Sequence, residues 1–328
     1  MKVFLTGGSG FVGSHVLDQL LAQGIPTRLL LRRTSSKRWI PTDSKLLEWS
    51  YGSLDDPISL AQALSPELTH VIHCAGLIQA ASPVDFYRVN AQGTRNLLEA
   101  IRQTGLNLQR FVLISSLSAS HPASPDQPAK ETDPSAPLSE YGKSKLAGEK
   151  EVRNHCPCPY VILRPSAVYG PRDVAFLPLF RLAQKGFYPK RTRPFYLNPI
   201  YVKDLARVIV ASLDHPETPG QTIHVTGPDV IEVSEMGKQL CSMFGKRPRP
   251  IPLPFWFLQL AGWLSTTVSR LSRQPILFAY GKDRELTAPG WVADRTLLQT
   301  LFQNHIPFTP LQQGLQETLQ WYQKEKWL

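Results

Sequence analysis

A glycine-rich turn near the start of the chain constrains the fold more than any other segment. Thr6–Gly13 (TGGSGFVG) follows a short apolar run, Val3–Leu5, and opens a stretch, Val12–Gln23, with apolar residues at helical spacing. A strand turns this sharply into a helix only where side chains are absent, and glycines also let a ligand approach the backbone. Free N–H groups at the start of such a helix attract phosphate. We therefore expect a dinucleotide pyrophosphate to bind at Gly7, Gly10, Phe11, Val12 and Gly13.

Short apolar runs alternate with helix-length segments through the first half of the chain. The predicted strands are Val3–Leu5, Thr27–Leu31, His70–His73, Phe111–Ile114 and Val161–Leu163. The predicted helices are Val12–Gln23, Phe86–Gln103 and Ser139–Arg153. This alternation is typical of a parallel sheet with crossover helices. The fold class is thus α/β, a Rossmann-type doubly wound parallel sheet with a smaller, mostly helical C-terminal substrate lobe.

The pattern becomes less regular after Pro165. We expect a nucleotide-binding domain over 1–166, to which 201–226 returns, and a substrate-binding lobe over 167–200 and 227–328. A loop bordering the substrate is expected at 121–137, which contains five prolines. The later predicted elements are a helix at Lys203–Leu213, a strand at Ile223–Val225, and a last helix that packs through Leu311, Leu315, Leu319 and Tyr322.

Composition excludes several classes of protein. With 42% hydrophobic and 19% charged residues, the chain is neither disordered nor a coiled coil. The net charge is +10, but the basic residues are scattered and no nucleic-acid-binding motif accompanies them, so we expect attraction of an anionic cofactor or substrate and no nucleic-acid partner. The four cysteines are too few for a disulfide framework, and the first residues lack the apolar core of a signal peptide. We therefore expect a cytoplasmic location.

Two further segments invite a special function. His155–Cys158 (HCPC) resembles half of a metal site, but no second pair of ligands occurs at a suitable spacing, so we expect no metal. The twenty residues from Pro250 to Ser269 carry no charge and include four aromatic residues. Their continuous apolar part is too short to span a bilayer. We favour a buried helix that lines the substrate site, and leave peripheral membrane contact through 251–268 as the alternative.

The segment after the second predicted strand indicates which nicotinamide cofactor binds. An NAD site places Asp or Glu there to hold the ribose 2′-hydroxyl. This chain instead has a basic run, from which we select Arg32, Arg33, Ser36 and Lys37 as ligands. Guanidinium groups bind phosphate in a bidentate manner. The run therefore favours NADP(H), with NAD(H) as the alternative.

A tyrosine and a lysine lie four residues apart in the third predicted helix. Tyr141 and Lys145 share a helical face, and an ammonium beside a phenol lowers the pKa of the phenol. Such a phenol exchanges a proton with a substrate oxygen. Ser115 and Ser116 follow the strand Phe111–Ile114, at the edge of a parallel sheet where ligands bind. The serine pair, Tyr141 and Lys145 are therefore expected to lie together at a reaction site.

Together, the glycine turn, the serine pair and the Tyr-x-x-x-Lys motif resemble the short-chain dehydrogenase/reductase superfamily. The similarity is to its extended branch, the NAD(P)-dependent epimerase/dehydratase family with its 3β-hydroxysteroid-dehydrogenase-like and dihydroflavonol-reductase-like members. The other matching segments are Val71–Gly76 (VIHCAG), Val89–Thr94 (VNAQGT), Leu163–Pro171 (LRPSAVYGP) and Tyr201–Ala206 (YVKDLA).

The resemblance implies a role for each matching residue. Ser116 would polarise the reacting carbonyl, with Ser118 as the substitute, Tyr141 would be the acid/base, and Lys145 would bind the nicotinamide ribose. Asn90 would brace the centre of the fold. The further cofactor contacts that it implies are Ser53, Leu54, Cys74, Ala75, Gly76, Asn90, Ser115, Tyr141, Lys145, Pro165 and Val168. It also implies a homodimer.

Two departures from the family pattern bear on the substrate. The adenine edge reads Gly52-Ser53-Leu54 where many relatives have Gly-Asp-Leu, and the arginine that clamps a sugar nucleotide's diphosphate is missing from its place before Tyr201. Arg193 or Arg172 is a candidate substitute. We expect an enzyme that interconverts a secondary alcohol and a ketone on an apolar, ring-containing small molecule. The alternatives are a nucleotide-sugar epimerase or dehydratase that recycles a tightly bound cofactor, and a non-catalytic dinucleotide-binding regulatory protein.

Overall fold

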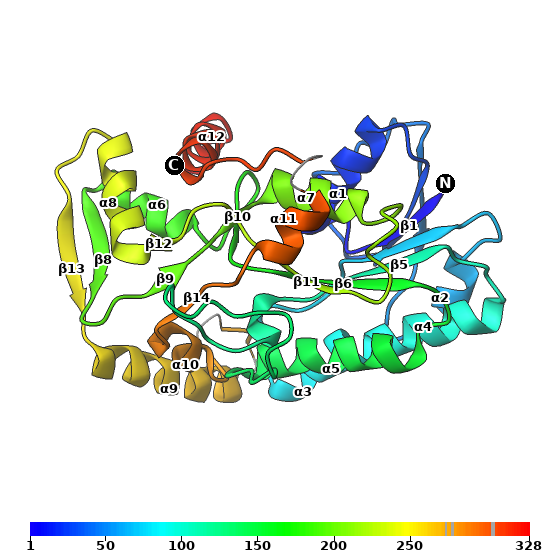
Figure 1. The fold of residues 1–328 in the computed structure, drawn as a ribbon, viewed down its shortest axis with the longest axis horizontal. Coiled ribbons are helices and arrows are strands. Elements are labelled where there is room, and N and C mark those ends of the chain that lie inside the picture. The colour runs from blue at the N-terminus through cyan, green and yellow to red at the C-terminus, as the bar shows by residue number, and fades with distance from the viewer. Residues whose placement is uncertain (273, 277–278, 303–305) are drawn as a thin grey trace.

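A seven-stranded sheet dominates the computed structural model, which describes residues 1–272, 274–276, 279–302 and 306–328 (Figure 1). The strand order is β11-β6-β5-β4-β1-β2-β3, and every neighbouring pair is parallel. Its strands are β1 (Val3–Thr6), β2 (Thr27–Leu31), β3 (Leu47–Tyr51), β4 (His70–His73), β5 (Arg110–Ile114), β6 (Tyr160–Pro165) and β11 (Thr222–Val225). The predicted fold class, a Rossmann-type doubly wound sheet, is confirmed.

Helices cover both faces of this sheet (Figure 1). One face packs against α1 (Phe11–Ala22), α7 (Val202–Ala211) and α11 (Thr296–Phe302), and the other against α2 (Pro57–Ala63), α4 (Gly93–Thr104) and α5 (Glu140–His155). Successive side chains of a strand point to opposite faces. Leu5 therefore contributes to the first core and Phe4 to the second, and the central strands are buried on both sides.

The rest of the chain forms the smaller lobe at the left of Figure 1. Its strands form small sheets: β7 (Val168–Tyr169) with β10 (Ile200–Tyr201); β8 (Phe187–Arg191) with β13 (Arg249–Leu253); and β9 (Tyr196–Leu197) between β12 (Ile231–Glu232) and β14 (Gly290–Trp291). Its helices are α6 (Leu177–Gln184), α8 (Val233–Met243), α9 (Phe255–Ser272), α10 (Lys282–Thr287) and α12 (Leu311–Lys324). Segment 200–226 runs back from this lobe to the main sheet, where β11 pairs with β6.

Most predicted elements are confirmed, with three differences in the first half of the chain, of which one is the helix α2, absent from the prediction. The five predicted strands and the helix at α12 are present, and Leu311, Leu315, Leu319 and Tyr322 are buried as expected. The edge strand β3 was not predicted, because its sequence LEWSY has only one fully buried residue. The single helix predicted at Phe86–Gln103 is wrong: the structure has α3 (Pro83–Tyr87), a π-helical turn η1 (Arg88–Gln92) and then α4.

The charge-free segment forms α9, and our preferred interpretation of it is wrong. Only Gly262 and Ser269 of α9 are buried, while seven of its large apolar side chains are exposed. The reason is that α10 packs on the side of α9 that carries these small residues, which leaves the large ones outside. Within the described residues, no helix combines the length and the hydropathy that crossing a membrane requires.

Three buried histidines make stability depend on pH. Burial lowers the pKa of His15 and of His224 to about 4, and that of His73 to about 3. Each folded pKa lies below the unfolded value near 6.5, so the unfolded chain takes up protons first as the pH falls. The free energy of unfolding should therefore decrease from about pH 6.5 downwards.

Calorimetry near pH 7.5 and near pH 5 measures this effect, and we expect a lower Tm at the acidic pH. Asp173 acts in the opposite direction, because burial raises the pKa of its carboxyl to about 6 and the folded protein then binds that proton first. Burial also lowers the pKa of His70 and raises the pKa of the Asp18, Glu131 and Asp204 carboxyls. Because the ordinary pKa of a carboxyl lies below 5 and that of an imidazole near 6.5, the histidines decide the sign between pH 7.5 and pH 5. A Tm that is constant or rises toward pH 5 would contradict the burial of these imidazoles.

Candidate active site

The glycine turn fits a dinucleotide because side chains have no room there. Gly7 has a φ of +76°, and a Cβ atom on it would lie 2.6 Å from the backbone nitrogen of Ala75. A Cβ on Gly13 would lie 2.2 Å from the carbonyl oxygen of Gly7. The turn and the start of α1 therefore lie directly against the end of β4. No side chain caps α1 and its first turn holds no acidic residue, so the positive end of the helix is free for a phosphate.

Tyr141 and Lys145 lie at the start of α5, which Ser139 caps by accepting a 3.0 Å hydrogen bond from the N–H of Gly142. The Lys145 ammonium donates a 2.7 Å hydrogen bond to the carbonyl oxygen of Ile114, at the end of β5. A Cβ on Gly76 would lie 3.2 Å from the Nζ atom of Lys145. The lysine thus lies where the ends of β4 and β5 meet.

Ser116 faces the tyrosine because a short turn holds it there. The residue precedes a 3₁₀ turn, η2 (Leu117–Ala119), and its Oγ accepts a 3.2 Å hydrogen bond from the N–H of Ser118. This turn packs so closely on α5 that a Cβ on Gly142 would lie 2.2 Å from the carbonyl oxygen of Ser118. The three predicted catalytic residues are therefore near one another.

Burial sets the protonation of both titratable groups. It raises the pKa of Tyr141 to about 12, and a hydrogen bond with Ser116 offsets part of that rise. It lowers the pKa of Lys145 to about 8. The expectation that Lys145 lowers the pKa of Tyr141 is not met, because the ammonium reaches instead to the carbonyl of Ile114. Near pH 7 the phenol is neutral and carries a proton that it can donate.

Asn90 connects the site to the helix beneath it. Its amide nitrogen donates to the carbonyl oxygen of Leu77 at 3.0 Å and to the Oγ atom of Ser144 at 2.9 Å, while its Oδ1 accepts from the N–H of Leu77 at 2.8 Å. It lies in the π-helical turn η1, a local widening that is frequent at functional sites. A Cβ on Gly148 would lie 2.3 Å from the carbonyl oxygen of Asn90, so a side chain there would push α5 away.

Ser115 contributes its hydroxyl to the fold rather than to the open site. It donates a 2.5 Å hydrogen bond to Glu149, whose carboxylate accepts two more from Arg164, at 2.8 and 2.7 Å. All three residues are buried. Pro165 ends the strand that carries Arg164, and Val168 begins β7 just beyond it. These two residues therefore lie at the same edge of the sheet as the end of β5.

The basic segment after β2 lies beside β3. Arg32 and Arg33 are exposed, and the guanidinium carbon of Arg33 lies 5.5 Å from the ring centre of Tyr51. The ammonium of Lys37 lies 4.5 Å from the ring centre of Trp49, so it is held by a cation–π contact.

The other residues predicted to contact the cofactor are partly used within the chain. The Oγ of Ser36 accepts from the N–H of Arg38 at 3.2 Å, and that of Ser53 accepts from the N–H of Asp55 at 3.3 Å. Leu54 is buried, against α4. Cys74 and Ala75, after β4, are half-buried, and the pKa of the Cys74 thiol is raised to about 11 by burial.

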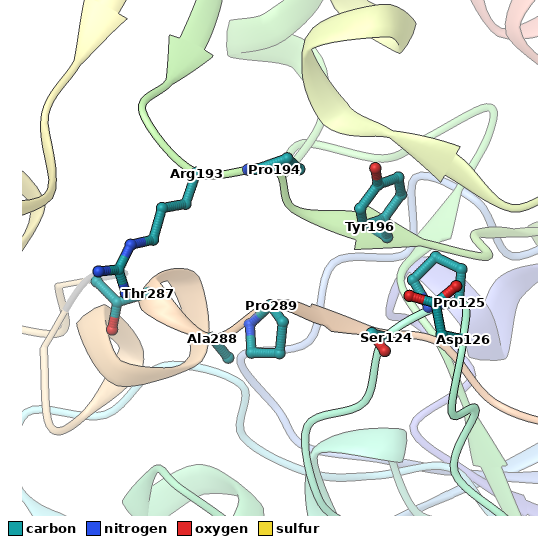
Figure 2. A pocket seen from close by; sticks show the side chains of 9 residues that line it. All are labelled: Ser124, Pro125, Asp126, Arg193, Pro194, Tyr196, Thr287, Ala288 and Pro289. Atoms are coloured by element: carbon teal, nitrogen blue, oxygen red, sulfur yellow. The ribbon is translucent and has the colours of Figure 1, made fainter.

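A cavity of about 470 Å³ lies in the smaller lobe (Figure 2). Its walls come from the proline-rich loop, from the segment around β9 and from the end of α10, and they consist of Ser124, Pro125, Asp126, Arg193, Pro194, Tyr196, Thr287, Ala288 and Pro289. Arg193 is thus placed at this cavity. Arg172 is not, because it pairs with Asp18 on α1 at 2.8 Å.

Residues of α10 connect this cavity with Tyr141, and the sequence did not reveal them. The ammonium of Lys282, at the start of α10, lies 5.4 Å from the ring centre of Tyr141, and Glu285 accepts a hydrogen bond from Ser139. Thr287, at the end of the same helix, lines the cavity. The cavity walls do not include Ser116, Tyr141 or Lys145, and the six residues of α10, about 9 Å long, separate the contact with Tyr141 from the contact with the cavity. No motif marks these residues, which follow Tyr141 by about 140 positions.

The HCPC segment shows no metal-binding cluster. The Sγ atoms of Cys156 and Cys158 lie 3.7 Å apart. Among the residues that the structure describes, no group of three or more candidate ligands is close enough to hold a metal ion.

The dinucleotide cradle and the Ser–Tyr–Lys arrangement define an NAD(P)-dependent oxidoreductase or epimerase. The model of the NAD dependent epimerase/dehydratase family matches residues 3–226, and the chain belongs to that family. The predicted resemblance is therefore confirmed.

Individual relatives include both reductases and epimerases. The chain is 32% identical to a ceramide reductase of Caulobacter vibrioides over 99% of its own length and 96% of the relative's. It is 29% identical to a UDP-glucose 4-epimerase of Vibrio cholerae over 83% of its own length and 85% of the relative's. The crystal structure of Thermus thermophilus UDP-glucose 4-epimerase with NAD is similar, with a TM-score of 0.75, 25% identity, and coverage of 98% of this chain and 99% of that one.

Proposed function

We propose that this protein is an NADP(H)-dependent oxidoreductase that interconverts a secondary alcohol and a ketone on an apolar small molecule. The observation that carries the proposal is a neutral, proton-bearing Tyr141 facing Ser116, with Lys145 one helical turn away. The similarity to a ceramide reductase over nearly the whole chain also supports a reductase. Loss of reduction in the Tyr141→Phe protein, argued in the Discussion, is the test.

The residues divide the reaction among them. A nicotinamide cofactor, bound along Gly7, Gly10, Gly13 and the ends of β4 and β5, supplies or accepts the hydride. Ser116 donates a hydrogen bond to the substrate oxygen and so polarises the carbonyl. Tyr141 gives its proton to that oxygen as the hydride reaches the carbon, and in the reverse direction takes it from the alcohol.

Lys145 serves this step by its charge. With a pKa of about 8 it is mainly an ammonium near pH 7, and it stabilises the phenolate that remains after Tyr141 loses its proton. Among the residues that the structure describes, one of its three N–H donors is used, on Ile114. The other two remain for the nicotinamide ribose.

We expect charge reversal at Arg32 and Arg33 to remove the preference for NADPH. Both side chains are exposed beside β3 and would lose their attraction for a 2′-phosphate. Fluorescence titration of the Arg32→Glu/Arg33→Glu protein should show a Kd for NADPH raised at least ~10-fold, with the Kd for NADH changed much less.

The matched control for this experiment is Arg38→Glu. Arg38 belongs to the same basic run, but it pairs with Glu325 at 3.2 Å and lies 4.4 Å from the ring centre of Trp39. Its reversal should leave the ratio of the two Kd values close to that of the unchanged protein. Equal affinity of the unchanged protein for NADH and NADPH would contradict the proposed cofactor.

A nucleotide-sugar epimerase is the second candidate, because Arg193 lies at the cavity and is available to a diphosphate. An epimerase of that kind returns the hydride to its substrate and keeps the cofactor through purification. The cofactor content of the purified protein therefore distinguishes the two candidates.

We further propose a homodimer that acts in the cytoplasm and contacts the membrane peripherally. The apolar surface of α9 supports the membrane contact. Light scattering after size-exclusion chromatography measures the oligomeric state, and cell fractionation measures the location.

A further inference from the structure

The helix α9 exposes large apolar side chains that a water-soluble surface normally covers. Trp256 is 63% exposed and Trp263 is 64% exposed. Leu271, near the end of the helix, is 82% exposed. The exposed set as a whole is Trp256, Phe257, Leu260, Trp263, Leu264, Val268 and Leu271.

These side chains share one face of the helix. At about 100° per residue, the seven positions fall within an arc of roughly 140°. Gly262 and Ser269, the only buried residues of α9, lie on the opposite side. The helix α9 is thus amphipathic, but its large apolar side chains face outward and its small residues face the protein.

Close packing with α10 fixes this orientation. A Cβ on Gly262 would lie 2.3 Å from the Cβ of Asp283, so only glycine permits the contact. The N–H of Tyr280 also donates a 3.1 Å hydrogen bond to Thr266, on the inner side of α9. Rotation of the tryptophans inward would remove these contacts. The exposed face is therefore a property of the folded protein.

The charge of the surrounding sequence indicates what this face meets. No acidic residue occurs between Glu235 and Asp283, although that stretch contains seven lysines and arginines. The stretch between Asp173 and Asp204 likewise contains six basic residues and no acidic one. It includes β8, which pairs with β13, the strand just before α9. An anionic partner complements this charge, and tryptophans beside basic residues are typical of helices that lie in the headgroup layer of a bilayer.

A second copy of the chain fits this face less well than an anionic bilayer. A two-fold contact places the same surface opposite itself. Arg270 on α9 is exposed and borders the apolar face on the helical wheel, so a self-contact would bring like charges together. A lipid surface removes the apolar side chains from water and neutralises Arg270.

The cavity lies next to this helix. The guanidinium carbon of Arg193, a cavity residue, lies 5.7 Å from the ring centre of Phe255, the first residue of α9. Thr287, another cavity residue, ends the helix α10 on which α9 packs. A molecule embedded in the bilayer under α9 is therefore close to the cavity.

We propose that α9 lies in the headgroup layer of an anionic bilayer and that the cavity takes a membrane-resident lipid, bearing a ketone or a secondary alcohol, directly from it. This inference rests on the proposed function and narrows its substrate class to lipids. The lipid's reacting carbon reaches Tyr141, and its apolar chain stays on the side of α9.

Vesicle co-sedimentation tests the surface. The purified protein should bind vesicles of phosphatidylcholine mixed with phosphatidylglycerol, bind weakly to phosphatidylcholine alone, and dissociate as salt is added. The Trp256→Ser/Trp263→Ser protein should bind at least ~10-fold more weakly, because both side chains leave the apolar face. The matched control is Ile58→Ser/Val84→Ser, which removes two apolar side chains that are 72% and 71% exposed elsewhere, and it should bind as the unchanged protein does.

Activity measurements separate this inference from the proposed function. The Trp256→Ser/Trp263→Ser protein should bind NADPH and reduce a short-chain methyl ketone in buffer normally, yet reduce a long-chain methyl ketone in vesicles at least ~10-fold more slowly. Two results would overturn the inference: the variant and the unchanged protein reduce the long-chain ketone in vesicles at equal rates, or the unchanged protein does not bind vesicles. The inference would also be overturned if the unchanged protein is a dimer and the Trp256→Ser/Trp263→Ser protein is a monomer, because α9 would then form the contact between two copies of the chain. Vesicle binding without reduction of either ketone would refute the proposed function and the lipid as its substrate, but leave the membrane contact standing.

Discussion

Replacing Tyr141 with phenylalanine is expected to lower kcat about 10²–10⁴-fold and to leave the Kd for NADPH nearly unchanged. The change removes the proton donor and keeps the aromatic ring. The centre of this ring lies 6.1 Å from the ring centre of Phe86. Most of the expected cofactor contacts lie in the glycine turn after β1 and at the end of β4, so the loss of this one hydroxyl should weaken cofactor binding little. Stopped-flow measurement of NADPH oxidation with a reducible ketone gives the rate, and fluorescence titration gives the affinity.

Tyr87→Phe is the control for this experiment. The hydroxyl of Tyr87 donates a 3.1 Å hydrogen bond to Glu140, one residue before Tyr141, but it does not face Ser116. We expect kcat to stay within about twofold of the original rate, since its removal leaves the proton donor in place. A Tyr141→Phe protein that turns over at the original rate would contradict the proposed mechanism.

Replacing Glu149 with glutamine is expected to lower the free energy of unfolding by about 3–5 kcal/mol. The Glu149 carboxylate is fully buried, and Arg164 is only 2% exposed. Their ion pair, with contacts of 2.8 and 2.7 Å, neutralises a guanidinium that has little access to water. A neutral amide leaves that charge uncompensated. Urea denaturation followed by circular dichroism measures the loss.

The matched control is Glu235→Gln, which removes an ion pair of 2.9 Å with Lys238 on the exposed face of α8. Both residues of that pair are solvated, so we expect no measurable change in the unfolding midpoint. A Glu149→Gln protein as stable as this control would show that the buried pair does not hold β6 against α5.

The sequence predicts the local elements well where a pattern of one kind continues through a segment. The strands β1, β2, β4, β5 and β6 are short apolar runs, and burial on both faces of a parallel sheet is what such runs indicate. The strand β3 alternates charged, aromatic and polar residues at the edge of the sheet, so it gave no such signal. Apolar residues continue at helical spacing on both sides of the π-helical turn around Asn90, so the sequence predicts a single helix over Phe86–Gln103.

The candidate site is predictable only as far as its motifs extend. Glycines before a helix and a tyrosine four residues from a lysine have local geometric reasons, and these residues could be selected in advance. The pKa of Tyr141 could not, because it depends on burial and on where the Lys145 ammonium points. Lys282 approaches Tyr141 from a distant part of the chain, and no local pattern marks that contact.

The orientation of α9 shows the same limit. A segment with apolar residues on most sides is compatible with burial and with a lipid surface. The deciding fact is that α10 packs on Gly262, which is a tertiary contact. The sequence shows which residues are apolar, and only the packing shows which of them remain exposed.

The nucleotide content of the purified protein distinguishes an exchanging NADPH-dependent reductase from an epimerase that recycles its cofactor. Mass spectrometry of small molecules released by acid denaturation identifies a retained cofactor, and titration of the same preparation with NADPH and NADH measures exchange. For the proposed reductase we expect little retained nucleotide and a site that binds NADPH at least ~10-fold more tightly than NADH. A full complement of retained NAD that does not exchange with added NADPH would contradict the proposed function and favour a self-recycling epimerase.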